Sequence, residues 1–202
     1  MLRVIGTFAA PEAPMSRRMK SKMPTFDEAK FKELILYIAD QCCSDRYWSA
    51  TKLNKVLFYS DFLYYQETGR SITGAEYQAL EYGPAPKKLL PIRQKLVDEG
   101  ALAIDQRKFQ HRVVPLRNPD LTNFAAQEIA IVNKVINCLK NASAETVSEL
   151  SHAFLGWKAA WTETEKSKEP VTIPYGTVFV DNPPIDEFEE AHGFALAKKY
   201  GW

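Results

Sequence analysis

The sequence predicts a predominantly α-helical chain of the α+β class, a compact helical domain with a short strand and a β-hairpin. The stretch 51–65 carries apolar or aromatic side chains on almost every side, which indicates a central helix packed on several faces. The runs 101–104 and 111–116 flank a polar tip and are typical of the two arms of a hairpin. A length of 202 residues suits one domain with appendages.

The beginning of the chain carries few structural signals. Residues 1–23 hold two prolines and scattered basic side chains, and we expect a disordered or non-native tail there. A single domain is expected over residues 24–202. Its core is expected in 26–160, and a C-terminal loop and helix in 161–202.

The first helix is predicted to begin close to residue 25. Thr25 and Glu28 have the spacing of a capping box, in which each side chain bonds the other residue's backbone N–H. Apolar residues then follow at helical spacing, at Phe31, Leu34, Ile35 and Ile38. This pattern predicts an amphipathic helix that turns one face to the core.

Polar groups interrupt the predicted central helix at Lys52, Lys55 and Asp61. The apolar run is therefore too short to span a membrane, which takes about 20 apolar residues. A carboxylate on such a helix needs a hydrogen-bond partner or a place at the helix edge. We expect a structural hydrogen bond for Asp61, with a functional role as the alternative.

A Tyr-Gly-Pro corner follows the central helix. Residues 77–82 resemble a strand, Gly83 can take a positive φ, and Pro84 suits the first turn of a helix. These features predict a sharp strand-to-helix turn and a helix over 84–99. Gly100 is expected to end that helix, as glycine often does just past a C-terminus.

The predicted hairpin after this helix has a basic tip and makes the middle of the chain winged-helix-like. Arg107, Lys108 and Arg112 could contact nucleic-acid phosphates from such a wing. The alternative is a solvated loop whose charges favour solubility. We favour the solvated loop, because the whole chain has a net charge of only +1.

The C-terminal part is predicted to be helical. Ser143 is a plausible N-cap of a helix that carries His152. Trp157 and Trp161, four residues apart, should share one helical face. A last helix is expected from the spacing of Ile185, Phe188, Ala191, His192 and Ala195.

The number and spacing of the cysteines indicate the redox state of the cellular compartment. Cys42, Cys43 and Cys138 are an odd number without metal-ligand spacing. This favours a reducing compartment and argues against a disulfide framework or a zinc site. We expect a cytoplasmic protein with no metal, no cofactor and no membrane partner.

The order Lys-Leu-x-Lys-x-x-x-Tyr, Tyr-Gly-Pro, helix and basic hairpin resembles the Panacea antitoxin domain, a family typified by the SocA antitoxin and phage-associated GepA proteins. A later Leu-Ser-His segment, followed by two tryptophans, resembles another part of the family. The resemblance covers about residues 26–160. The positions that carry the first part are Lys52, Leu53, Lys55, Tyr59, Tyr82, Gly83 and Pro84.

The resemblance implies a prokaryotic antitoxin of a type II-like toxin–antitoxin system, which neutralises a toxin by direct binding. It also implies an additional role as an adaptor to a protease or its unfoldase. We expect aromatic side chains to be the anchors of such binding. The candidates are Tyr64, Tyr65, Tyr77, Tyr82, Trp157 and Trp161, and more than half of them are expected to be core residues.

The family motif itself is expected to be mainly structural. Its residues are Lys52, Leu53, Lys55, Tyr59, Asp61, Gly83, Pro84 and His152. His152 is interpreted as a core or capping histidine, because its neighbour Ser151 cannot face it on a helix.

Two other functions stay open. The first is a DNA-binding autoregulator that uses the 84–99 helix and the basic hairpin as its wing, which we do not favour. The second is a small enzyme, although no P-loop, HExxH or GxSxG motif is present. An enzyme would need a pocket that gathers His152, Asp61 and a serine or tyrosine. We expect a non-enzymatic protein of unknown oligomeric state.

Overall fold

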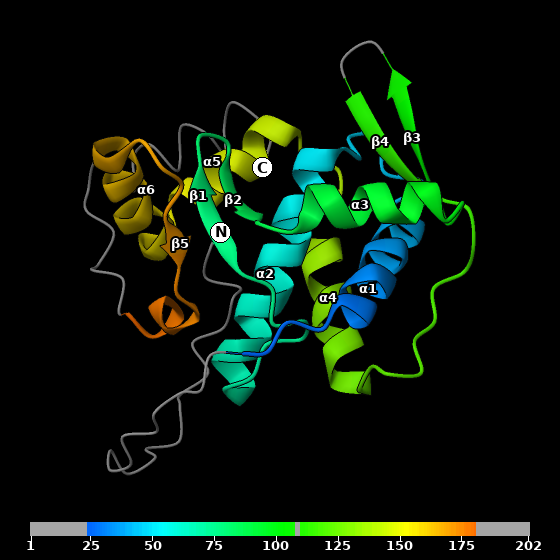
Figure 1. The fold of residues 1–202 in the computed structure, drawn as a ribbon, viewed down its shortest axis with the longest axis horizontal. Coiled ribbons are helices and arrows are strands. Elements are labelled where there is room, and N and C mark those ends of the chain that lie inside the picture. Colours follow the sequence, from blue (N-terminus) through cyan, green and yellow to red (C-terminus); the bar gives the residue numbers. More distant parts are fainter. Residues whose placement is uncertain (1–23, 108–109, 181–202) are drawn as a thin grey trace.

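The computed structural model describes residues 24–107 and 110–180. The tail predicted over residues 1–23 and the last helix predicted around 185–195 lie outside these ranges. The fold is predominantly helical with small antiparallel sheets, as predicted (Figure 1). Its elements are α1 Glu28–Gln41, α2 Ala50–Thr68, β1 Tyr77–Leu80, β2 Gly83–Pro86, α3 Leu89–Asp98, β3 Leu102–Arg107, β4 Gln110–Pro115, α4 Ala126–Leu139, α5 Ala144–His152, α6 Leu155–Ser167, β5 Thr172–Ile173 and the 3-10 helix η2 Tyr175–Phe179.

Helix α2 is the centre of the fold, as the sequence predicts. It contacts α1, α4 and α5, and also β2, β4 and η2 (Figure 1). Ser49 accepts a bond from the Lys52 N–H and caps its start, and Gly69 ends it with φ +73°. Because neighbours surround it, apolar side chains on several of its faces are removed from water at once.

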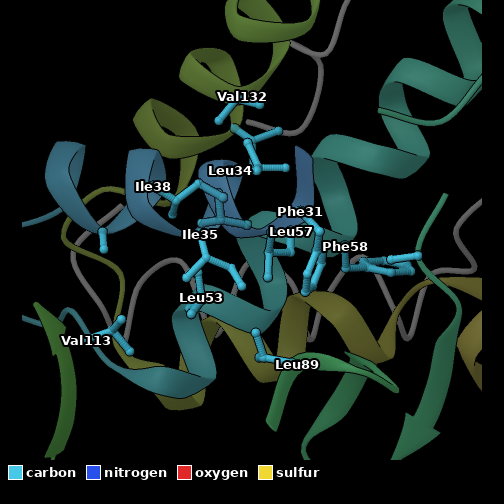
Figure 2. Packing of buried hydrophobic residues seen from close by; sticks show 14 of the residues in the cluster. Phe31, Leu34, Ile35, Ile38, Leu53, Leu57, Phe58, Leu89, Val113 and Val132 are labelled. Atoms are coloured by element: carbon cyan, nitrogen blue, oxygen red, sulfur yellow. The ribbon is translucent and has the colours of Figure 1, made fainter. Parts of the chain in front are cut away.

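The main core lies between α1, α2 and the elements that cover them (Figure 2). Phe31, Leu34, Ile35 and Ile38 of α1 are fully buried, as their spacing predicts. They pack with residues of α2, and α3, β4 and α4 add further apolar groups to the same cluster. Full burial of each such side chain contributes roughly 1.5–3 kcal/mol to the free energy of unfolding.

Helix α1 begins later than the predicted capping box. Its N-cap is Asp27, whose carboxylate accepts from the Lys30 N–H at 2.9 Å. The backbone N–H of Asp27 donates to the Thr73 carbonyl at 2.8 Å, and the Thr25 backbone lies tightly against Gly74. This pairing holds residues 25–27 extended, so the Thr25 capping-box prediction is wrong.

The prediction of a helix beginning at Pro84 is also wrong. Residues 83–86 form strand β2, which pairs antiparallel with β1, and α3 begins only at Leu89. Gly83 does take a positive φ of +93°, but it reverses the chain into a second strand. Pro84 and Pro86 are tolerated because β2 is an edge of the sheet ordered β2-β1-β5, where missing N–H donors cost little.

The hairpin after α3 is longer than predicted. Gly100, with φ +68°, follows the end of α3, and β3 then pairs with β4 from Leu102↔Pro115 to Arg107↔Gln110. Ser143 caps α5 as predicted, accepting from the Thr146 N–H at 3.1 Å. Within residues 24–107 and 110–180, no helix has the length and apolar character needed to cross a bilayer.

Candidate functional site

The hairpin turn between β1 and β2, residues 80–84, is called here the Tyr-Gly-Pro turn. Leu80 pairs with Gly83 across it, and Glu81 and Tyr82 at its tip are exposed. Two features of position 83 require glycine. Its φ disfavours any other residue, and a Cβ would lie 2.5 Å from Lys55 Nζ and closer still to Ser151 Oγ.

Lys55 of α2 reaches this turn from inside the protein. Its ammonium nitrogen donates to the Tyr82 carbonyl and, at 3.3 Å, to the Pro84 carbonyl. The side chain is only 1% exposed, and no carboxylate among the described residues pairs with it. Burial lowers the pKa of Lys55 to about 7, because the charged form loses its hydration.

Lys52, one turn earlier on α2, has a different environment. It is equally buried, but its Nζ lies 2.6 Å from the Asp45 carboxylate and 2.9 Å from the Ala142 carbonyl. Burial alone would raise the pKa of Asp45, but bonds from Lys52 and from backbone N–H groups outweigh it and leave the pKa lowered. Lys52 therefore joins α2 to two loops by a buried ion pair.

Helices α5 and α6 hold the other end of the turn. The indole N–H of Trp157 donates to the Leu80 carbonyl at 3.2 Å, and His152 interacts with the Glu81 backbone. The His152 and Trp157 rings stack with centroids 4.1 Å apart, and Trp161 stacks on Trp157 at 5.5 Å. Burial and the Lys55 charge lower the pKa of His152 below its ordinary value.

Lys55, His152 and Trp157 together form what we call the turn clamp. They come from three helices: Lys55 and Trp157 donate to backbone carbonyls at residues 80, 82 and 84, and His152 interacts with the backbone of Glu81. The side chain of Tyr82 is left 69% exposed at the tip. The arrangement thus presents one aromatic ring on a backbone that is bonded from inside.

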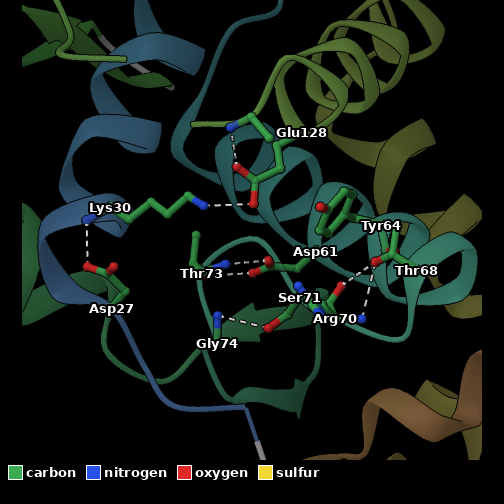
Figure 3. A network of polar contacts seen from close by, with 11 residues as sticks. Asp27, Lys30, Asp61, Tyr64, Thr68, Arg70, Ser71, Thr73, Gly74 and Glu128 are labelled. Carbon is green, nitrogen blue, oxygen red and sulfur yellow. Dashed lines mark hydrogen bonds and ion pairs between the residues drawn. The ribbon is translucent and has the colours of Figure 1, made fainter. Parts of the chain in front are cut away.

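Asp61 lies in a second polar cluster on the same helix (Figure 3). Its carboxylate accepts from the Thr73 N–H at 2.9 Å, the Thr73 hydroxyl at 2.6 Å and the Tyr77 hydroxyl at 2.8 Å. Burial raises the pKa of Asp61 in spite of these bonds. The cluster attaches the segment before β1 to α2, which is a structural role.

The six aromatic anchor candidates separate by exposure. Tyr77 is 1% and Trp157 is 7% exposed, so both belong to the core and cannot act as surface anchors in this conformation. Tyr64, Tyr65 and Trp161 are half-buried. Tyr82 is the fully presented ring among the six.

The structure gives little support to the DNA-binding alternative. Arg112 donates to the Cys43 carbonyl at 2.9 Å and to the Asp45 carbonyl at 3.3 Å, so it ties β4 to the loop after α1. Arg107 ends β3, and Lys108 lies outside the described residues. Helix α3 also starts later than this hypothesis requires.

Two cavities of about 340 Å³ lie elsewhere on the molecule. One is polar and lies between the end of α1 and α4, beside Asp45 and Lys140. The other is mainly apolar and lies between α6 and η2, beside Leu155 and Val180. Neither is lined by His152 or Asp61, so neither is the pocket that an enzyme hypothesis needs. Within the described ranges, no cluster of His, Cys, Asp or Glu could hold a metal ion.

Sequence reasoning missed that separate motifs meet at one turn. The Lys-Leu-x-Lys, Tyr-Gly-Pro and Leu-Ser-His…Trp segments all contribute to the clamp or to its target. It also missed the close packing of Ser151 against Gly83. The signal that could have revealed this is the fixed order of motifs separated by unrelated residues.

The chain matches one known protein family over the residues that form this site. The family model described as "Antitoxin SocA-like, Panacea domain" matches residues 53–158, more than half of the chain. The match runs from α2 into α6 and includes the three clamp residues and Gly83. No curated protein and no solved structure matches the chain.

Proposed function

Because the chain belongs to the SocA-like Panacea domain family, which supports an antitoxin-type function, we propose that it neutralises a partner toxin by direct binding. The proposed docking surface is the Tyr-Gly-Pro turn, with Tyr82 at its centre. The observation that carries this proposal is the 69% exposure of Tyr82 on a turn whose backbone is bonded from inside.

An aromatic ring on a fixed backbone is a favourable anchor. Tyrosine is enriched among residues that dominate interface energetics, and it loses little rotamer freedom on binding. A turn that already has its bound conformation costs less ordering free energy than a loop that must be arranged on contact. The partner is expected to offer an apolar slot with a hydrogen-bonding group for the phenol hydroxyl.

The test requires a toxin, and the candidate is the product of a small adjacent gene that is toxic when expressed alone. Co-expression with this chain should restore growth, and the two proteins should co-purify. Tyr82→Ala should weaken the complex by about 2 kcal/mol, or roughly 30-fold, as for an interface hot spot. Leu90→Ala is the matched control, because Leu90 is 66% exposed on α3.

Each result has a defined meaning. Rescue by wild type and Leu90→Ala but not by Tyr82→Ala supports the proposed surface. Equal rescue by both variants rejects the Tyr82 surface. If the wild-type chain neither binds a confirmed toxin nor restores growth in its presence, the proposal that it neutralises that toxin is rejected.

Delivery of the toxin to a protease or its unfoldase is a separate proposal. It predicts that the toxin becomes less abundant when this chain is present. The measurement compares toxin abundance between protease-deficient and wild-type cells that both express this chain. Equal abundance in both strains would leave direct binding as the whole mechanism.

A further inference from the structure

The turn clamp suggests how the proposed docking surface is held in place. We infer that Lys55 is a positioning residue that fixes the Tyr-Gly-Pro turn from inside and so sets the place of Tyr82 for toxin binding. This inference rests on the proposed function. It differs from it because it concerns a buried residue that no partner can touch.

The first support is the pair of acceptors at Lys55. A buried lysine is normally paired with a carboxylate, as Lys52 is with Asp45 on the same helix. Lys55 instead donates to two backbone carbonyls of one turn. The loss of hydration around this amine destabilises its charged form. The two bonds that the amine donates hold the turn in one conformation.

The second support is the fit between Lys55 and Gly83. The amine reaches the carbonyls of Tyr82 and Pro84 because the intervening residue has no side chain in its path. Glycine at this position therefore permits both the turn conformation and the approach of the amine.

The third support is that the other clamp residues act on the same short segment. Trp157 holds Leu80, and His152 interacts with Glu81, from helices far from α2 in the sequence. Residues on both sides of Tyr82 are thus attached to the helical core. Loss of the Lys55 donor frees the side of the turn that carries Tyr82.

The proton on Lys55 offers a readout that a purely structural side chain would not give. Other titratable groups near it are His152 on α5, Glu81 in the turn and Tyr59 one turn along α2. Glu149 acts on His152 from the same helix. Burial lowers the pKa of both Lys55 and His152, and the pKa of Lys55 falls to about 7, so the amine changes charge around pH 7. Opening the turn would hydrate the amine and favour proton uptake, so higher pH favours the closed turn.

The experiment combines toxin binding with NMR of the full chain. Lys55→Met keeps an unbranched side chain of similar shape but removes the amine and its donors, and it should weaken toxin binding by about tenfold or more. Ser151→Ala is the matched control, since Ser151 also lies against Gly83 but donates to the Ser148 carbonyl instead. It should bind within about twofold of wild type. Circular dichroism establishes that each variant is folded.

In wild type, the amide shifts of Tyr82 and Gly83 should follow the Lys55 side-chain carbon signal through its transition around pH 7, and the transition should vanish in Lys55→Met. If Lys55→Met does not fold, Trp157→Phe replaces it, because this change removes the donor to Leu80 and keeps an aromatic ring beside His152 and Trp161. Its toxin binding should fall in the same direction by a smaller factor.

The outcomes separate the two proposals. Normal binding by folded Lys55→Met, with loss in Tyr82→Ala, overturns the positioning role and leaves the docking surface intact. Normal binding by Tyr82→Ala overturns the surface itself. Amide shifts of the turn that do not change as Lys55 titrates also overturn the positioning role, whether or not a toxin has been identified.

Discussion

A Cβ at Gly83 would lie only 2.5 Å from the Lys55 amine, so the turn and the buried lysine are fitted to each other. Gly83→Ala should lower the free energy of unfolding by about 2 kcal/mol or more, since the positive φ alone costs about 1–2 kcal/mol for an L-residue and the overlap adds to it. Urea unfolding followed by circular dichroism measures the loss.

Gly69 provides the control for that change. It has a similar φ of +73°, but nothing lies within 4 Å of its Cβ position. Gly69→Ala should therefore cost only the conformational part, about 1–2 kcal/mol. Equal losses in the two variants would show that the Lys55 approach does not matter to stability.

The bond from Tyr77 to Asp61 gives a second prediction. Tyr77→Phe removes one of the donors to a fully buried carboxyl group and should lower the free energy of unfolding by about 1–3 kcal/mol. Tyr64→Phe is the control, because no bond of its hydroxyl is found within the described residues, and it should change stability by less than about 0.5 kcal/mol. Thermal unfolding of both variants compares them, and no difference would mean that Asp61 does not need Tyr77.

Stability should depend on pH through Lys55. Its folded pKa of about 7 lies below the ordinary value of 10.5, so the unfolded chain binds more protons between these values. The free energy of unfolding should then rise with pH above 7, by up to about 1.4 kcal/mol per pH unit. The stabilisation from the neutral amine is lost as pH falls towards 7.

The range from pH 7 to 8.5 isolates this effect. His152, whose pKa is lowered by burial, contributes below its ordinary pKa of 6.5. Burial raises the pKa of Cys42 from 9.0 to about 12, which lowers stability only above pH 9. The free energy of unfolding, measured by urea unfolding at each pH, should therefore rise with pH more steeply in wild type than in Lys55→Met. An equal pH dependence in the two proteins would exclude Lys55 as the source.

Arg112 provides a prediction about the hairpin. Its guanidinium bonds the carbonyls of Cys43 and Asp45, so Arg112→Ala should lower the free energy of unfolding by about 1–2 kcal/mol. Arg70→Ala, at an exposed position just after α2, should be close to neutral. Urea unfolding tests stability, and promoter-DNA binding at low and high salt tests the wing hypothesis. A loss of DNA binding without a loss of stability would favour the wing.

Several elements of the fold were predictable because their signals are local. Helix α2 could be recognised from apolar residues on many faces, and α1 from its repeating apolar positions. Gly100 and Ser143 mark helix ends through their own backbone and side-chain chemistry. The hairpin β3–β4 followed from two short runs on either side of a polar tip.

The error at Pro84 has a clear physical origin. A proline after a positive-φ glycine is compatible with a helix start and with an edge strand alike. Pairing of residues 83–86 with β1 decided between them, and β1 is itself held by β5 from far along the chain. Local preference alone could not resolve this choice.

The sequence by itself determined the family motifs, the central helix and the residue types that a tight turn needs. Only the tertiary structure decided that Lys52 meets a carboxylate while Lys55 meets two carbonyls, and that Tyr82 is exposed while Tyr77 is buried. The physical reason is distance along the chain. Helical periodicity is set within four residues, whereas the clamp joins Lys55 and Trp157 to a turn whose position depends on how all the helices pack.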